Sequence, residues 1–361
     1  MKVDVFKIAQ NSPADLSGLE ALIQAKKLDP TAIVAIMGKT EGNGCVNDFT
    51  RGYAVQTLKH FLGQHLGSQA EQIVYVMSGG TEGVLSPHLT VFTRQTQDLV
   101  GEPHWGLVLG TSQTRDFAPE EIGTLAMVQV VAASVKAAIA EAGIAPADVH
   151  FVQIKCPLIH TSRTQAHDLQ SLKTQDGYKS MAYSRGASAL GIALALGELS
   201  PDQITDADIC ANYGLYSAVA STSAGVELQN CEILVLGNAP TSYSSYVIGH
   251  SVMQHALDTA AIHQAIASTG RSPDQTVSNQ TVPNQIVNVF AKAEADPSGQ
   301  ILGQRHTMLD DSDISHTRMA RAVVGAVIAA AVQDPMIYVS GGAEHQGPAG
   351  GGPIAVIAQA D

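Results

Sequence analysis

Three short stretches with the same spacing decide the fold: MSGGTEG at residues 77–83, STSAGVE at 221–227 and VSGGAEH at 339–345. Each contains a serine, a glycine two positions later and a glutamate four positions later. An apolar run typical of a buried strand follows each one, namely LTVFT from Leu89, EILVLG from Glu232 and PIAVIA from Pro353. A pattern that returns at long intervals predicts an internal repeat.

Two further signals come before each serine and in the same order. An apolar run ends at a lysine in AIVAIMGK, VHFVQIK and QIVNVFAK, and an arginine follows in FTRGYAV, YSRGASAL and HTRMARAV. We therefore predict an α/β fold of three homologous β/α units, at residues 1–102, 106–247 and 250–361. Packing of these units around a pseudo-threefold axis would form a barrel-like core with one central active site.

The helices of these units have recognisable ends. We expect a helix over residues 12–28 that begins with Ser12 as N-cap and Pro13 in the first position. A second helix is expected over residues 119–143, with acidic residues in its first turn and Gly143 at its end.

Composition limits the possible functions. The chain has 361 residues, 45% of them apolar and 15% charged, which indicates a compact protein with a large core. A net charge of −13 argues against nucleic acid as a partner. The N-terminal stretch has no visible signal peptide, and the longest apolar run, residues 322–332, is too short to cross a membrane. With four widely spaced cysteines, we expect a reduced, cytoplasmic protein without membrane partners.

Convergence of the three units would place three lysines, three arginines and three serines in one pocket. Glycine-rich turns can point backbone N–H groups at a carbonyl oxygen. A serine beside a lysine can act as a nucleophile with its base, provided that burial and nearby guanidinium groups keep the lysine neutral. Arginine donates forked hydrogen bonds to carbonyl oxygens. Such a pocket suits a flat cyclic ligand with carbonyl and N–H groups in threefold symmetry.

At this point the sequence resembles the ring-opening amidohydrolases, the family of cyanuric acid hydrolase and barbiturase. The motifs that carry the resemblance are MSGGTEG, AYSRGASALG, STSAGVEL, GQRHTMLDDSD and VSGGAEHQGPAGGGP, and the resemblance covers the whole chain. The resemblance implies three similar units around a pseudo-threefold axis. It also implies hydrolysis of cyanuric acid through carboxybiuret to biuret, no catalytic cofactor, and a cytoplasmic homotetramer.

The family's functional residues carry over by position. The resemblance implies that Ser223 is the nucleophile and Lys155 its base. The implied substrate-binding residues are Lys39, Arg51, Ser78, Gly79, Arg185, Ala224, Lys292, Arg318, Ser340 and Gly341. Ala224 stands where the other two units have glycine, but it keeps the N–H group.

The resemblance also implies a structural Mg²⁺ or Ca²⁺ in the third unit. The matching positions are Glu294, Ala343, Gln346, Gly347, Pro348 and Gly351. One carboxylate with backbone and amide oxygens is a reasonable donor set for a hard cation. A catalytic zinc is not expected, since the chain contains no H-E-x-x-H motif.

The three Ser/Lys pairs cannot all attack one ring. We expect the second unit to be the reactive one, because the apolar VQIKCPLI around Lys155 should lower the lysine pKa more than MGKTEGNG does around Lys39. Two alternatives remain open: a barbiturase, and a cyclic-imide binding protein without turnover. A third, a thiolase-like or chorismate-mutase-like repeat fold with other chemistry, has no supporting motif.

Overall fold

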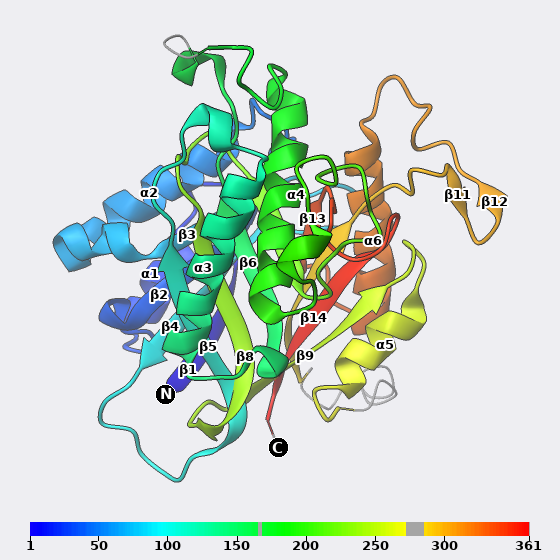
Figure 1. Ribbon diagram of the computed structural model, residues 1–361. Coiled ribbons are helices and arrows are strands. Elements are labelled where there is room, and N and C mark those ends of the chain that lie inside the picture. The colour runs from blue at the N-terminus through cyan, green and yellow to red at the C-terminus, as the bar shows by residue number, and fades with distance from the viewer. Residues whose placement is uncertain (165–167, 272–284, 361) are drawn as a thin grey trace.

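Three four-stranded sheets form the interior of the protein (Figure 1). The structure, a computed structural model, describes residues 1–164, 168–271 and 285–360. In each sheet the unit's last strand lies between its first and second strands and is antiparallel to both, while the second and third strands pair in parallel. The predicted α/β class is confirmed. In the described ranges the three sheets stay separate and do not join into one closed barrel.

The first sheet and its helices comprise β1 (Lys2–Ala9), α1 (Ser17–Gln24), β2 (Ile33–Thr40), α2 (Phe49–Leu66), β3 (Val74–Gly79) and β4 (His88–Gln95). The second set comprises β5 (His104–Gln113), α3 (Leu125–Ala142), β6 (Val149–Cys156), α4 (Gly177–Leu196), β7 (Ala220–Ala224) and β8 (Glu232–Ser242). The third comprises β9 (Tyr246–Met253), α5 (Thr259–Ala267), β10 (Ile286–Ala293), α6 (His316–Val332), β13 (Tyr338–Gly341) and β14 (Gly352–Gln359), with a small hairpin of β11 (Gln300–Ile301) and β12 (Gln304–Arg305).

Aspartate caps open two of the three helices that follow the lysine strands, whereas the N-cap residue of α6, Ser315, makes no side-chain cap hydrogen bond within the described residues. Asp48 accepts a hydrogen bond from the Thr50 N–H at the start of α2, and Asp176 accepts two at the start of α4. α3 begins at Leu125, later than the predicted residue 119, because Pro119–Glu121 form a separate 3₁₀ turn. At its C-terminal end, Gly143 has φ of 70°, a left-handed conformation that glycine adopts without strain. These caps fix the direction in which each helix leaves its sheet.

The predicted start of the first helix is wrong. α1 begins at Ser17 instead of near Ser12. The Asp15 carboxylate accepts hydrogen bonds from the N–H groups of Asn11 and Ser17, which holds this segment in a turn. Side-chain bonding to the local backbone here outcompetes an earlier helix start.

Each helix pair covers its own sheet, and a central core joins the three sheets. In Figure 1 the pairs α1 and α2, α3 and α4, and α5 and α6 lie outside the strands. α3 is apolar and long enough to span a membrane by length and composition, but much of it packs into the core of the second unit. At the centre, the ring of Phe290 lies 6.3 Å from that of Phe92 and 5.2 Å from that of Phe151, one phenylalanine from each sheet.

Candidate active site

The parallel strand pairs place each motif serine beside a lysine. Lys39 lies opposite Ser78 in β2 and β3, Lys155 opposite Ser223 in β6 and β7, and Lys292 opposite Ser340 in β10 and β13. Residues in register on neighbouring parallel strands point to the same face of the sheet. The sequence order of lysine strand and serine strand therefore becomes three neighbouring Lys/Ser pairs in space.

All three serines border one hollow of about 260 Å³, which we call the central hollow. Its lining residues are Gly44, Arg51, Ser78, Gly79, Met181, Arg185, Ser223, Ala224, Arg321, Ser340 and Gly341. Every unit contributes a serine, the residue after it and an arginine. The structure thus brings together most of the predicted substrate-binding residues.

The three lysines lie fully buried beneath this hollow and have unequal partners. Lys39 Nζ donates to Ser78 Oγ at 3.3 Å, and Lys292 Nζ donates to Ser340 Oγ at 3.1 Å. Lys155 Nζ instead donates to the Met77 carbonyl at 2.8 Å and lies 3.0 Å from Glu227 Oε1. The second pair is therefore the one whose lysine is engaged away from its own serine.

Burial lowers the pKa of each lysine, but not equally. The pKa values of Lys39 and Lys292 lie well below the ordinary range, because burial is reinforced by Arg321 and Arg185 respectively. Burial also lowers the pKa of Lys155, but the Glu227 carboxylate opposes this shift. The pKa of Lys39 is thus the more strongly lowered, contrary to the expectation from the sequence. Around Lys39 the charge of Arg321 outweighs that of Glu82, whereas around Lys155 the charge of Glu227 outweighs that of Arg51.

Two of the three motif glutamates form forked hydrogen bonds with an arginine from another unit. Glu82 of the first unit receives two hydrogen bonds from Arg321 of the third, at 2.8 and 2.5 Å. Glu344 of the third unit receives two from Arg185 of the second, at 2.8 and 2.6 Å. These forked, buried ion pairs link the units as well as the pocket walls.

The second unit's glutamate is held differently. Arg51 of the first unit donates to the Ala224 carbonyl at 3.0 Å and to the Cys45 carbonyl at 2.8 Å, and its Nε has no hydrogen-bond partner within the described structure. Burial raises the pKa of Glu227, but Lys155 and Arg51 outweigh it and hold that pKa below its ordinary value. Glu227 Oε1 is close enough to Lys155 for an ion pair, although no hydrogen bond of good geometry reaches it in the described residues.

Arg318 does not line the central hollow, although the sequence had aligned it with Arg51 and Arg185. Its side chain is 43% exposed and lies 3.2 Å from Glu82 at a neighbouring surface hollow. Arg321, three residues later on α6, is buried and lines the central hollow instead. The two arginines are neighbours on one helix face, so the sequence pattern alone could not choose between them.

The serines approach one another closely at the base of the hollow. Ser223 Oγ lies 3.0 Å from Ser340 Oγ. Below them Tyr338 is completely buried, with its ring 5.9 Å from that of Phe290. Burial raises the pKa of Tyr338 to about 12, partly offset by the hydroxyl groups of Ser223 and Ser78, so the phenol stays protonated. Sequence reasoning missed Tyr338, which lies in an ordinary apolar strand pattern.

Comparison with known proteins places this geometry in a family. A family described as amidohydrolase ring-opening protein matches residues 4–359. The chain belongs to this family. A cyanuric acid amidohydrolase of Bradyrhizobium diazoefficiens is 54% identical over 366 residues, covering 99% of this chain and 98% of that protein. One from Pseudomonas sp. strain ADP is 51% identical over 367 residues, covering 99% of each.

Solved structures agree over the same length. One described as "Cyanuric acid hydrolase: evolutionary innovation by structural concatenation" has a TM-score of 0.93 at 50% identity and covers 99% of both chains. A cyanuric acid hydrolase from A. caulinodans has a TM-score of 0.92 at 48% identity, with the same coverage. The similarity to these two structures therefore covers the whole fold of this chain.

The residues predicted to hold a structural metal lie together in the third unit. Glu294 follows β10, and the loop of residues 343–351 packs over that strand end, where a Cβ on Gly350 would lie 2.5 Å from Asp296 Oδ2. Burial raises the pKa of Glu294 to about 8, reinforced by the charge of Glu344. In the described ranges no three His, Cys, Asp or Glu side chains are grouped to hold a metal, so a cation there would depend on backbone oxygens.

The donor chemistry of this loop is compatible with a hard cation. The side-chain oxygen of Gln346 accepts a hydrogen bond from the Thr222 N–H, so Gln346 would have to offer its backbone carbonyl. The other predicted ligands of the cation have only backbone carbonyl oxygens to offer, namely Ala343, Gly347, Pro348 and Gly351. Two carboxylates buried side by side repel each other when both are ionised, and a bound cation would offset that repulsion.

Proposed function

We propose that this chain hydrolyses cyanuric acid, opening its ring to carboxybiuret, which loses CO₂ to give biuret. The observation that carries the proposal is the central hollow, where one serine and one arginine from each unit surround a single space. Cyanuric acid presents three equivalent carbonyl groups, and the hollow offers three similar sets of donors. The relatives named cyanuric acid amidohydrolase support this choice of substrate.

In the proposed mechanism Ser223 Oγ attacks a ring carbonyl carbon, and Lys155 Nζ takes the serine proton. The ring C–N bond of that carbonyl breaks, and the leaving nitrogen takes the proton from Lys155. Water then hydrolyses the ester on Ser223, which restores the serine. Ser78 and Ser340, with the N–H groups beside them, would bind and polarise the other two carbonyls. Arg51, Arg185 and Arg321 would supply positive charge at the rim.

We propose further that the three units are related by a pseudo-threefold axis through the central hollow. Contacts between units support a ring order: β3 packs on β6, β7 on β13, and β13 on β2. We also propose that Glu294 and its loop hold Mg²⁺ or Ca²⁺, that no catalytic cofactor is required, and that the protein is a cytoplasmic homotetramer. The four cysteines are free thiols, which is compatible with a reducing compartment.

The test is incubation of purified protein with cyanuric acid and, separately, with barbiturate, with product identification by mass spectrometry. We expect consumption of cyanuric acid and formation of biuret without added nucleotide, flavin or zinc. Preferential consumption of barbiturate would make the protein a barbiturase. Tight binding of either ring without turnover would make it a binding protein, and neither binding nor turnover by folded protein would refute the proposal.

A further inference from the structure

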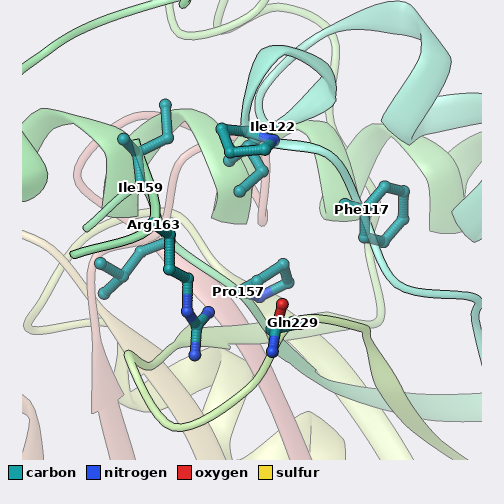
Figure 2. Close-up of a pocket in the computed structure, with 8 residues that line it drawn as sticks. Phe117, Ile122, Pro157, Ile159, Arg163 and Gln229 are labelled. Atoms are coloured by element: carbon teal, nitrogen blue, oxygen red, sulfur yellow. The ribbon is translucent and has the colours of Figure 1, made fainter. Parts of the chain in front are cut away.

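The loop that carries Glu227, residues 225–231, is tied to another loop by one arginine. Arg163, in the segment between β6 and α4, donates Nη1 to the Leu228 carbonyl at 2.5 Å and Nη2 to the Val226 carbonyl at 2.8 Å. These two carbonyls belong to the residues on either side of Glu227. Figure 2 shows the Arg163 side chain extending toward the segment that contains Gln229.

We propose that Arg163 is a positioning residue for the reaction: it fixes the Glu227 loop so that the Glu227 carboxylate stays beside Lys155. This inference rests on the proposed function, because Lys155 is the proposed base. Arg163 lines a hollow next to the loop rather than the central hollow, so it acts through Glu227 and not on the substrate.

The glutamate of the second unit needs a support through its backbone because no forked arginine holds its carboxylate, unlike those of the other two units. Glu82 and Glu344 are each gripped by a forked arginine, Arg321 and Arg185. The arginine that faces Glu227, Arg51 of the first unit, donates to main-chain carbonyls instead. The position of the Glu227 carboxylate therefore depends on its backbone, and Arg163 holds that backbone on both sides of the residue.

The surroundings give the loop space to move if this support is lost. A hollow of about 410 Å³ lies next to it, lined by Gln229 of the loop, by Arg163 and by apolar side chains such as Phe117 and Ile122 (Figure 2). Main-chain hydrogen bonds hold the ends of the loop, from the Gly225 N–H to the Cys156 carbonyl and from the Thr114 N–H to the Cys231 carbonyl. Between these ends, Arg163 holds the carbonyls on either side of Glu227, so its loss would free the part of the loop that carries the carboxylate.

Displacement of Glu227 would change the chemistry at Lys155. The charged and titratable groups around Lys155 are Glu227, Arg51, Cys156 and Glu232. Of these, the Glu227 carboxylate is the one that lies 3.0 Å from Nζ. When Lys155 takes the proton of Ser223, this carboxylate stabilises the ammonium group that forms. Without it, the lysine would be a weaker base and would hold its proton less well at every pH.

The test compares Arg163→Met and Arg163→Lys with the wild-type protein. The pH dependence of kcat and kcat/KM for cyanuric acid is measured, together with hydrogen–deuterium exchange of the peptide that covers residues 225–231. We expect Arg163→Met to reduce kcat about 10- to 100-fold, as a small misplacement of a reacting group does, and to leave KM within about twofold. The acid limb of the profile should move to lower pH, exchange in the loop should accelerate, and Arg163→Lys should recover part of kcat.

Arg271→Met is the matched control, because Arg271 also donates to a main-chain carbonyl, that of Gln359, but at the far end of β14. An unchanged pH profile in Arg163→Met, or a loss of kcat no larger than in Arg271→Met, overturns the inference. If Arg163→Met does not fold, Arg163→Lys and Arg163→Gln give the same comparison. Failure of the proposed function is separately visible, because the wild-type protein would then consume no cyanuric acid, whereas the exchange rates still report whether Arg163 holds the loop.

Discussion

Lys155 and its two counterparts occupy the same place in three similar sheets but have different partners. Lys39 and Lys292 each donate a hydrogen bond to the neighbouring serine, whereas Lys155 lies beside a carboxylate and donates to the Met77 carbonyl. A repeated backbone therefore does not produce repeated chemistry. The difference comes from which arginine reaches each motif glutamate, and the forked arginines leave Glu227 alone free to approach its lysine.

This comparison suggests a division of roles. Lys39 and Lys292, with pKa values well below the ordinary range, are suited to stay neutral and donate hydrogen bonds to their serines. Lys155, whose lowered pKa is opposed by Glu227, can accept a proton and hold it as a stabilised ammonium. A catalytic base must accept the proton of the nucleophile and hold it until the leaving group takes it. Lys155 of the second unit is therefore the better candidate for the chemical step.

The most severe test removes each serine in turn. We expect Ser223→Ala or Lys155→Ala to reduce kcat on the order of 10⁶-fold, as loss of a nucleophile or its base does, with ligand binding retained. Ser78→Ala and Ser340→Ala should cost about 100- to 1,000-fold, because each removes only one carbonyl-polarising group. Single-turnover kinetics and calorimetric binding measure the two effects. A covalent adduct trapped on Ser78 or Ser340, with none on Ser223, would reverse the comparison.

The second test asks which of Arg321 and Arg318 is the buried arginine that supports the pocket. Arg321→Met leaves the buried Glu82 carboxylate without its forked partner, which should reduce the free energy of unfolding by about 3 to 5 kcal/mol. Arg318→Met removes an exposed charge and should change it by less than about 0.5 kcal/mol. Urea denaturation of both variants decides between them. A larger loss for Arg318→Met would show that the two side chains had been assigned the wrong way round, and equal losses would contradict the buried, pairing role given to Arg321.

These two arginines show where sequence reasoning reached its limit. The order of lysine strand, arginine helix and serine motif was visible in the sequence. The sequence did not predict that each serine stands on a strand in register with its lysine, which the parallel strand pairs of the structure show. Which of two arginines three residues apart points inward depends on how α6 sits on its sheet, and no local pattern encodes that. The predicted start at Ser12 was wrong for a similar reason, since the Asp15 side chain decides it.

The functional glutamates were written in the sequence but had no assigned role. Glu82, Glu227 and Glu344 stand at the same position of each motif, and that repetition was a usable signal. Arg163 left no such signal, because its partners are backbone carbonyls, which every residue has. Contacts to the main chain are the part of this site that only the folded structure reveals.

A third test uses the residues opposite the lysines in the neighbouring strands. Glu232 lies opposite Lys155, and burial raises its pKa to about 7, although it accepts a hydrogen bond from the Tyr75 N–H. His88 lies opposite Lys39, and burial lowers its pKa to about 4. The raised carboxyl pKa stabilises the fold fully below pH 4.5, its unperturbed value, and this contribution disappears as pH rises through about 7.

Glu232→Gln should therefore remove a decline in stability of up to about 3 kcal/mol between these two pH values, while keeping the acceptor for Tyr75. His88→Gln should act at the opposite end: the lowered histidine pKa contributes stability that is present above pH 6.5 and is lost as pH falls through about 4. Denaturation midpoints measured from about pH 4 to 9 separate the two. A wild-type profile that Glu232→Gln leaves unchanged would mean that the carboxyl titrates normally in the second unit.

The smallest expected effect concerns the third unit, which alone extends its serine motif into a glycine-rich loop. If Glu294 and the carbonyls of residues 343–351 hold a cation, Glu294→Gln should weaken binding and lower the melting temperature in Mg²⁺ or Ca²⁺ by a few degrees. A ligand at about 100 times its Kd contributes about 2.7 kcal/mol, which sets the upper limit of the change. The KM for cyanuric acid should change less than twofold, because Glu294 does not line the central hollow.

Asp310→Asn is a matched control, since that carboxylate also lies in the third unit but pairs with Arg305 at the exposed surface. Chelator should lower the melting temperature of the wild type and of the control, but not that of Glu294→Gln. Equal metal content in all three proteins would contradict a cation site in this loop. The extra glycines would then serve only the close packing over β10.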